Sequence, residues 1–227
     1  MITTVFLDVD NTLLDFSEGS RRCMAEGFRA FGIPYKDEMF SVFHAINSRL
    51  WHRVEDGTLT REELFEIRWN TIFEALGIQA DGIAFEQEFR RQLRDSAIPM
   101  EGAEELLQYL HQKKYTLVIA SNAVREQQVR RLTKAGLFPY IDLVATSEEA
   151  GYAKPKKEFF DYCLSLLPPE TTPQQIMMIG DSLAADIGGG QAYGLKTCWF
   201  NYHHEENTGR VYPDYTVTAL RELFAIL

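Results

Sequence analysis

The chain has 227 residues, of which 45% are hydrophobic, so it can bury a substantial core in one large domain or two smaller ones. It carries 33 Asp and Glu residues against 23 Lys and Arg residues, a net charge of −10 that would repel a nucleic-acid polymer or an anionic membrane over most of the surface. We therefore expect neither as a partner, whereas a small anion held by one local site is compatible with this charge.

Three features predict a cytoplasmic protein. The three cysteines lie far apart and outside any C-x-x-C spacing, which is typical of a reducing compartment and argues against a disulfide framework or a zinc cluster. The chain begins directly with a strand pattern, without the basic and apolar segments of a leader peptide. It contains no run of 18 apolar residues, the length that a membrane-spanning helix needs.

Five short apolar runs are predicted to be strands buried on both faces, and in chain order they are residues 4–9, 116–120, 141–146, 176–179 and 197–200. Helical patterns lie between the runs at residues 103–112, 126–135 and 156–167. The first follows a turn at residues 99–102, and the other two are stopped by Gly136 and by Pro168-Pro169. Strands that alternate with helices of this length require right-handed crossovers. The pattern therefore predicts an α/β fold with a doubly wound, Rossmann-like parallel sheet.

Residues 16–96 contain no strand pattern and have helical periodicity throughout. Thr60 and Glu63 have the spacing of a capping box at a helix start. Two amphipathic stripes follow helical spacing, one at positions 39, 43, 46, 47 and 50 and the other at positions 65, 69, 72, 73 and 76. We expect a helical domain of residues 16–96, inserted into an α/β core domain of residues 1–15 and 97–227.

Four polar clusters stand at strand ends or at the entry to the next helix, where the loops of a parallel sheet converge on one crevice. In chain order they contain Asp8 and Asp10, then Ser121 and Asn122, then Lys154, and finally Asp181 and Asp186. Each cluster alone has an ordinary explanation, because carboxylates and hydroxyls cap turns and helices and most lysines are solvated. Their occurrence in this order is improbable by accident, so we expect one shared site.

In this order the clusters resemble the four motifs of the haloacid dehalogenase (HAD) superfamily: D-x-D-x-T, Ser or Thr, Lys, and G-D-x-x-x-x-D. The helical insertion resembles the cap of this superfamily, so the likeness spans the whole chain. It implies a phosphatase in which Asp8 attacks phosphorus and forms an aspartyl phosphate. Asp10 would protonate the leaving oxygen and then activate water. Thr12 would orient the loop.

The same resemblance implies a magnesium cofactor. Mg²⁺ would be held by the side chains of Asp8 and Asp181 and the backbone carbonyl of Asp10, with Asp186 in support through water. The equatorial phosphoryl oxygens would be bound by Ser121, Asn122 and Lys154. The resemblance also favours phosphoryl chemistry over dehalogenation. The dehalogenases of this superfamily lack the second aspartate, which is Asp10 here, and need no Mg²⁺.

Finer features resemble the pyrimidine 5′-nucleotidase branch, in residues 47–51, 55–64 and 197–201. This resemblance implies a small phosphorylated substrate, a nucleoside monophosphate. We expect the protein to be either a monomer or a homodimer. A sugar-phosphate or phosphoglycolate phosphatase and a phosphomutase share the four motifs and differ in the cap. A non-catalytic binding module is a more remote alternative, because it would have little need for all four motifs intact.

Several other residues allow two interpretations. Trp51 and Trp69 have the spacing of core residues, although an aromatic ring can also stack on a base, and Arg49 and Arg61 can steer an anion or lie on a solvated face.

The pair His203-His204 is predicted to be a surface pair, since adjacent side chains diverge and no third ligand is suitably spaced. The glycines at 188–190 indicate either close packing near the Asp181 loop or a frayed helix.

Overall fold

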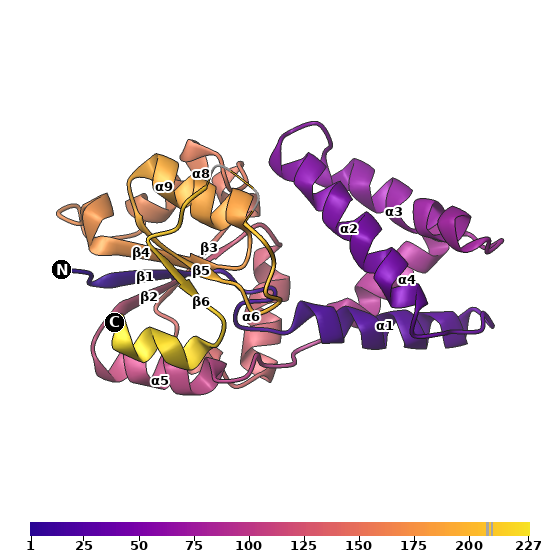
Figure 1. Cartoon of the computed structure of the whole chain (residues 1–227), viewed down its shortest axis with the longest axis horizontal. Helices are drawn as coiled ribbons and strands as arrows, with labels where there is room; N and C mark the ends of the chain where they lie inside the picture. The colour runs from indigo at the N-terminus through magenta and orange to yellow at the C-terminus, as the bar shows by residue number, and fades with distance from the viewer. Residues whose placement is uncertain (208, 210) are drawn as a thin grey trace. The chain divides into compact units, whose positions relative to one another are not determined.

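The computed structural model describes residues 1–207, 209 and 211–227 (Figure 1). The chain divides into two compact units, one formed by Met1–Asp15 with Ala97–Leu227 and the other by Phe16–Ser96. Within the described residues, no helix is both long enough and apolar enough to cross a membrane.

The first unit contains a six-stranded parallel sheet in the order β3-β2-β1-β4-β5-β6. Its strands are β1 (Thr4–Leu7), β2 (Thr116–Ser121), β3 (Leu143–Thr146), β4 (Ile176–Gly180), β5 (Lys196–Phe200) and β6 (Tyr215–Val217). The chain starts in the middle of the sheet, extends it to one edge through β2 and β3, and then crosses back to build the other half. The predicted doubly wound α/β fold is confirmed.

Helices cover both faces of this sheet, as Figure 1 shows. Val5 and Leu7 of β1 point into one core with residues of α5 (Ala103–Gln112), α6 (Arg125–Lys134) and the C-terminal η4 (Leu220–Ala225). Phe6 points into the opposite core, which includes Phe159 and Phe160 of α8 (Lys157–Ser165). This alternation explains why the strands are apolar on both sides in the sequence.

Two elements of the first unit differ from the prediction. The sixth strand, β6, was not predicted, because it has only three residues and only Val217 of them is buried. The short helix α7 (Ser147–Ala150) stands between β3 and Lys154, so the chain does not pass directly from that strand into α8. The remaining short elements are η1 (Phe138–Tyr140), η2 (Pro173–Gln175), η3 (Leu183–Gly188) and α9 (Gly189–Tyr193).

The strand register brings the polar clusters to one edge of the sheet. Leu7 of β1 pairs with Ile119 of β2 and with Ile179 of β4, so these three strands end side by side. Asp8 follows β1, Ser121 ends β2, and Gly180 ends β4. Parallel strands present their carboxyl ends at the same edge, which is where ligand sites form in sheets of this kind.

The second unit consists of the helices α1 (Phe16–Ala30), α2 (Met39–Glu55), α3 (Arg61–Leu76) and α4 (Gly82–Leu93), all within the described residues. The predicted capping box begins α3: Thr60 accepts from the backbone of Glu63, and the Glu63 carboxylate accepts from the backbone of Thr60. The core of this unit is aromatic, with Trp69 stacked on Phe43 at a centroid distance of 5.5 Å.

A buried ion pair crosses this aromatic core. The Arg68 guanidinium donates to both carboxylate oxygens of Glu86, at 3.0 and 2.6 Å, and to Asn47 Oδ1 at 2.9 Å. We expect Arg68→Met to lower the free energy of unfolding by about 3–5 kcal/mol, because it leaves the Glu86 carboxylate buried without its cation. Denaturant unfolding measures this loss, and the double variant Arg68→Met/Glu86→Leu should recover most of it. Equal stability of Arg68→Met and the parent would contradict the expectation.

Candidate active site

The loop after β1 places the first two carboxylates. Asp8 continues the strand ladder, with its backbone N–H donating to Ile179 O at 3.0 Å, and it is buried, with 8% of the residue exposed. The chain then turns sharply at Asn11, which has a left-handed φ of 59° and donates to Leu14 O at 2.7 Å. Asparagine tolerates this backbone region better than most side chains. The turn leaves the Asp10 side chain partly exposed at the edge of the site.

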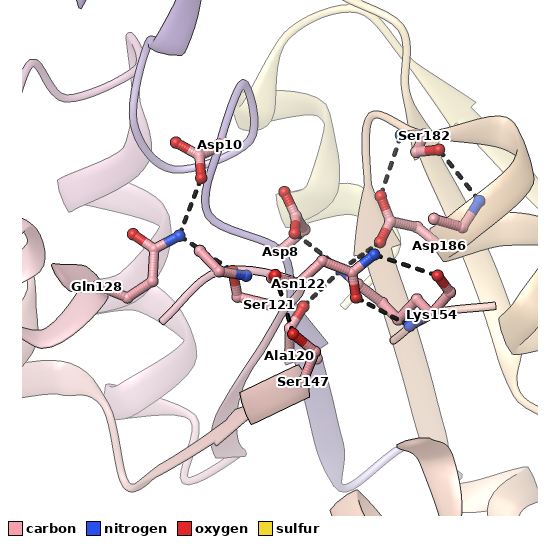
Figure 2. A network of polar contacts seen from close by, with 12 residues as sticks. Asp8, Asp10, Ala120, Ser121, Asn122, Gln128, Ser147, Lys154, Ser182 and Asp186 are labelled. Carbon is pink, nitrogen blue, oxygen red and sulfur yellow. Dashed lines mark hydrogen bonds and ion pairs between the residues drawn. The ribbon is translucent and has the colours of Figure 1, made fainter. Parts of the chain in front are cut away.

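Lys154 lies at the centre of the site, between two of the predicted metal-site carboxylates (Figure 2). Its Nζ donates to Asp8 Oδ1 at 2.8 Å, to Asp186 Oδ1 at 2.6 Å and to Ala120 O at 2.6 Å. An ammonium group has three donors, so all three are used inside the protein. Contact with a phosphoryl oxygen, which the motif resemblance implies, requires one of these bonds to be exchanged.

Asn122 fixes the backbone of Lys154. The Asn122 amide nitrogen donates to Lys154 O at 3.1 Å, and the backbone N–H of Lys154 donates to Asn122 Oδ1 at 2.8 Å. This reciprocal pair joins the second motif to the third across 32 residues of sequence. Ser121 is buried beside it, and its Oγ accepts from the backbone N–H of Ala123 at 3.2 Å.

The last motif is held by close packing and by backbone donors. The backbone N–H of Ser182 donates to Asp186 Oδ2 at 3.0 Å, and Trp199 Nε1 donates to Asp181 O at 2.8 Å. A Cβ on Gly180 would overlap the Asp186 carboxylate, so only glycine fits at this strand end. The segment Leu183–Gly188 is a π-helix, a form that occurs often at functional sites.

The glycine run that follows is explained by close packing. A Cβ on Gly189 would lie 2.8 Å from Pro155 Cα, next to Lys154, and a Cβ on Gly190 would lie 3.1 Å from Thr197 Cγ2 on β5. Of the two interpretations of residues 188–190, the structure therefore favours close packing over a frayed helix.

Three carboxylates converge as a group that can hold a metal ion. Asp8, Asp181 and Asp186 each offer one oxygen, and these oxygens all lie within 4.8 Å of one another. Opposite ligands of an octahedral Mg²⁺ lie about 4 Å apart, so the spacing suits two direct ligands and a third acting through water. Both oxygens of Asp186 already accept hydrogen bonds from Lys154 and Ser182, which fits the indirect role.

The charges of the cluster also suit a divalent cation. Three ionised carboxylates and one ammonium sum to −2, and hard oxygen donors are the ligands that Mg²⁺ prefers. Burial raises the pKa of Asp8 to about 7, with the carboxylates of Asp186 and Asp10 adding to the rise and Lys154 opposing it. Burial likewise raises the pKa of Asp181 well above its usual value, and the charge of Asp8 adds to the effect.

The pKa of Lys154 moves upward although burial, the largest single effect, favours the neutral amine. The carboxylates of Asp186 and Asp8 together outweigh burial. The lysine therefore stays charged, and it is the internal counter-ion of the two carboxylates.

These shifts predict how pH and Mg²⁺ act together on stability. From about pH 4 to about pH 7 the folded protein holds a proton on Asp8 that the unfolded chain has lost, and the raised pKa of Asp181 acts in the same direction. Without metal, both groups therefore lower the free energy of unfolding as pH rises. Mg²⁺ competes with those protons and binds only the folded site. We therefore expect the rise in Tm caused by Mg²⁺ to grow from pH 5 to pH 8.

Thermal unfolding with Mg²⁺ or with a chelator at each pH measures this difference. The parent and Asp161→Asn, which changes an exposed carboxylate paired with Lys157, should show the same Mg²⁺ effect. A Tm at pH 8 that is independent of Mg²⁺ would contradict the assignment of the three carboxylates to a metal.

Two residues of α6 that sequence reasoning missed contact Asp10. Arg131 Nη1 donates to Asp10 Oδ1 at 2.6 Å, and Gln128 Nε2 donates to Asp10 Oδ2 at 2.9 Å. Both are buried, with Gln128 0% and Arg131 1% exposed. Their spacing of three residues puts the two side chains on the same face of α6, but this spacing alone does not point to Asp10.

The other candidates of the sequence analysis that lie between residues 16 and 96 belong to the second unit. Trp69 is fully buried in the core of the second unit, and Trp51 is half-buried against the same core. Arg49 is exposed, and Arg61 is half-buried with Glu62 at 3.6 Å.

His203 and His204 are exposed, as expected of a surface pair. The Thr12 hydroxyl is buried and has no hydrogen-bond partner in the described part of the chain, and the orienting role expected of it stays a prediction.

Comparisons with known proteins agree with this geometry. The family model described as haloacid dehalogenase-like hydrolase matches residues 2–194. The chain is 37% identical to the HAD-hydrolase YfnB of Bacillus subtilis over 99% of this chain and 94% of that protein. It superposes on a crystal structure of YfnB bound to magnesium with a TM-score of 0.93, at 36% identity, covering 100% of this chain and 98% of that one.

Two further relatives have names that specify a substrate class. The pyrimidine 5′-nucleotidase YjjG of Escherichia coli is 33% identical over 98% of this chain and 96% of its own length. The pyrimidine 5′-nucleotidase PynA of Streptococcus pneumoniae is 30% identical over 98% of this chain and 94% of its own length. The chain belongs to the haloacid dehalogenase-like hydrolase family, so the family resemblance and the expectation of an enzyme are confirmed.

Proposed function

We propose that this protein is a Mg²⁺-dependent phosphatase that passes a phosphoryl group through Asp8 and hydrolyses pyrimidine nucleoside monophosphates. The observation that carries the proposal is the buried cluster in which Lys154 joins Asp8 to Asp186, with Asp181 completing a three-carboxylate group. A phosphoryl ester is an anion, and a bound divalent cation lets it approach a carboxylate nucleophile.

The residues divide the reaction into two steps. In the first, an Asp8 oxygen forms a bond to phosphorus, the ester P–O bond breaks, and Asp10 gives its proton to the leaving nucleoside oxygen. In the second, Asp10 takes a proton from water as that water attacks phosphorus, and orthophosphate leaves Asp8. The Ser121 hydroxyl and the Lys154 ammonium are the donors for the equatorial oxygens, with one Lys154 bond exchanged for the phosphoryl group.

The choice of phosphoryl chemistry over dehalogenation depends on Asp10 and Asp181. A halide leaves as an anion and needs no proton, whereas an alkoxide leaving group needs a general acid such as Asp10. A halo acid also has no phosphate group whose charge a cation would neutralise. The three-carboxylate group would therefore have a function in phosphoryl transfer and none in dehalogenation.

Support for the nucleotide comes from the two relatives named pyrimidine 5′-nucleotidases, each matched over 98% of this chain. The test is a substrate panel of uridine and thymidine monophosphates beside hexose phosphates and phosphoglycolate, with Mg²⁺ or with a chelator. We expect kcat/KM for the two nucleotides to exceed that for the other esters by about tenfold or more, a preference within the range that a few pocket contacts give.

The panel separates the two parts of the proposal. Faster turnover of a sugar phosphate would contradict the nucleotidase assignment and leave the phosphatase intact. Failure to release phosphate from any ester, including an artificial aryl phosphate, would overturn both parts. An Asp8→Asn preparation, purified in parallel, controls for contaminating phosphatases.

A further inference from the structure

Gln128 connects two residues that have different tasks in the proposed reaction. Its Nε2 donates both to Asp10 Oδ2, at 2.9 Å, and to Ser121 Oγ, at 3.0 Å. Figure 2 shows the amide standing between the two groups. A primary amide has two N–H donors, so both bonds can be made at once. The proton donor of the first step and a phosphoryl-binding hydroxyl are thus fixed relative to each other by one side chain.

Arg131, one helical turn further along α6, sets the orientation of that amide. Its Nη1 donates to Gln128 Oε1 at 3.0 Å as well as to Asp10 Oδ1 at 2.6 Å. Because the amide oxygen faces the guanidinium, the amide nitrogen faces Asp10 and Ser121. The two side chains therefore act together, and both carboxylate oxygens of Asp10 are held.

The same contacts direct the Ser121 proton. Ser121 Oγ accepts from Gln128 Nε2 at 3.0 Å and from the backbone N–H of Ala123 at 3.2 Å. A hydroxyl oxygen has two lone pairs, so these bonds occupy both, and the O–H remains available as a donor. A hydroxyl whose proton is already directed toward its target loses no orientational freedom when an oxyanion arrives.

We propose that Gln128 and Arg131 form a positioning pair that holds Asp10 for proton transfer to the leaving group and presents the Ser121 hydroxyl to the phosphoryl oxygens. The inference rests on the proposed phosphatase function and adds two residues to it. The pair contacts Asp10 and Ser121, the residues assigned to the leaving group and to a phosphoryl oxygen, so we place its action on that side of the site.

Leaving-group dependence distinguishes positioning of a general acid from general loss of structure. Nitrophenolate is a stable anion that leaves without a proton, whereas phenolate benefits from one. In Gln128→Met and Arg131→Met we expect kcat/KM for phenyl phosphate to fall by about 10–100-fold, and that for 4-nitrophenyl phosphate to fall at least about fivefold less. A variant that had merely lost folded protein would lose both activities equally.

The sequence supplies matched controls on the same helix, because Gln127 and Arg130 precede the two residues. Gln127 is half-buried and Arg130 is exposed, whereas Gln128 and Arg131 are buried. Gln127→Met and Arg130→Met should keep the parent ratio of the two kcat/KM values. Circular dichroism and Tm check that each variant is folded. If Arg131→Met is not soluble, the test is decided by Gln128→Met, in which an uncharged side chain is replaced by one of similar size.

Orthophosphate is the probe for the Ser121 part of the proposal. Its inhibition constant should rise several-fold in Gln128→Met and stay unchanged in Gln127→Met. An unchanged ratio of phenyl to nitrophenyl turnover in the folded variants would overturn the role at Asp10, and unchanged orthophosphate inhibition would overturn the role at Ser121. If the parent itself hydrolysed neither ester with Mg²⁺ present, the proposed function would fail instead.

Discussion

Replacing Asp8 with asparagine is expected to lower kcat by about 10⁴-fold or more, since a neutral amide cannot attack phosphorus and carry the phosphoryl group as a carboxylate does. Asparagine has the same shape, and its Oδ1 can still accept from Lys154 Nζ, which lies 2.8 Å from Asp8 Oδ1. The loss is therefore assigned to the missing nucleophile and its charge.

Stability separates this variant from a misfolded one. Burial raises the pKa of Asp8, which means that the site disfavours the charged form in the absence of metal. The neutral amide should thus be accommodated without loss, and with a chelator at pH 8 the Tm of Asp8→Asn should equal or exceed that of the parent. Its gain in Tm from Mg²⁺ should be smaller, because one carboxylate ligand is gone.

The measurement is steady-state phosphate release together with thermal unfolding of the same preparations. Asp161→Asn, an equal chemical change at an exposed carboxylate outside the site, is the matched control and should keep parent activity. Residual activity of Asp8→Asn within tenfold of the parent would remove Asp8 as the nucleophile, however well its neighbours suit a metal.

The parts of this site that the sequence predicted are those set by strand ends. An apolar run buried on both faces is a strong signal, and the residue after it must lie at the carboxyl edge of the sheet. Asp8 after β1, Ser121 at the end of β2 and Asp181 after β4 were placed in this way. Their convergence then follows from parallel topology, which needs no knowledge of side-chain packing.

The parts that escaped prediction depend on tertiary packing. Gln128 and Arg131 are polar residues on a short, strongly polar helix, a pattern that ordinarily indicates a solvated face. They are buried because α6 packs next to the first loop, which brings them to Asp10 across 118 and 121 residues of sequence. No local pattern encodes a contact over that distance.

The bonding of Lys154 also could not be predicted from the motif. The resemblance implied a phosphate ligand, whereas the structure shows an ammonium whose three donors go to Asp8, Asp186 and Ala120 O. Under the proposed function this residue would have two successive tasks: it neutralises the carboxylates, and it then exchanges one of these bonds for a phosphoryl oxygen. The strand β6 was missed for a simpler reason, because three residues with one buried side chain carry too little periodicity.

Replacing Lys154 with methionine should therefore affect stability and activity together. The change leaves two buried carboxylates without their internal cation, and such a loss typically costs about 3–5 kcal/mol in the free energy of unfolding. The missing donor to the phosphoryl group should lower kcat by a further factor of about 10²–10³. Chemical denaturation and steady-state turnover measure the two effects. Lys157→Met, which changes an exposed lysine three residues away, is the matched control and should leave both quantities unchanged.

A second substitution distinguishes the two effects. In Lys154→Met/Asp186→Asn one of the two buried charges is removed, while the new amide oxygen can still accept from the backbone N–H of Ser182, so most of the lost stability should return. Turnover should stay low, because neither substitution restores a donor for the phosphoryl oxygens. If activity recovered along with stability, Lys154 would be a structural counter-ion alone, and Ser121 would be the remaining side-chain donor to the phosphoryl group.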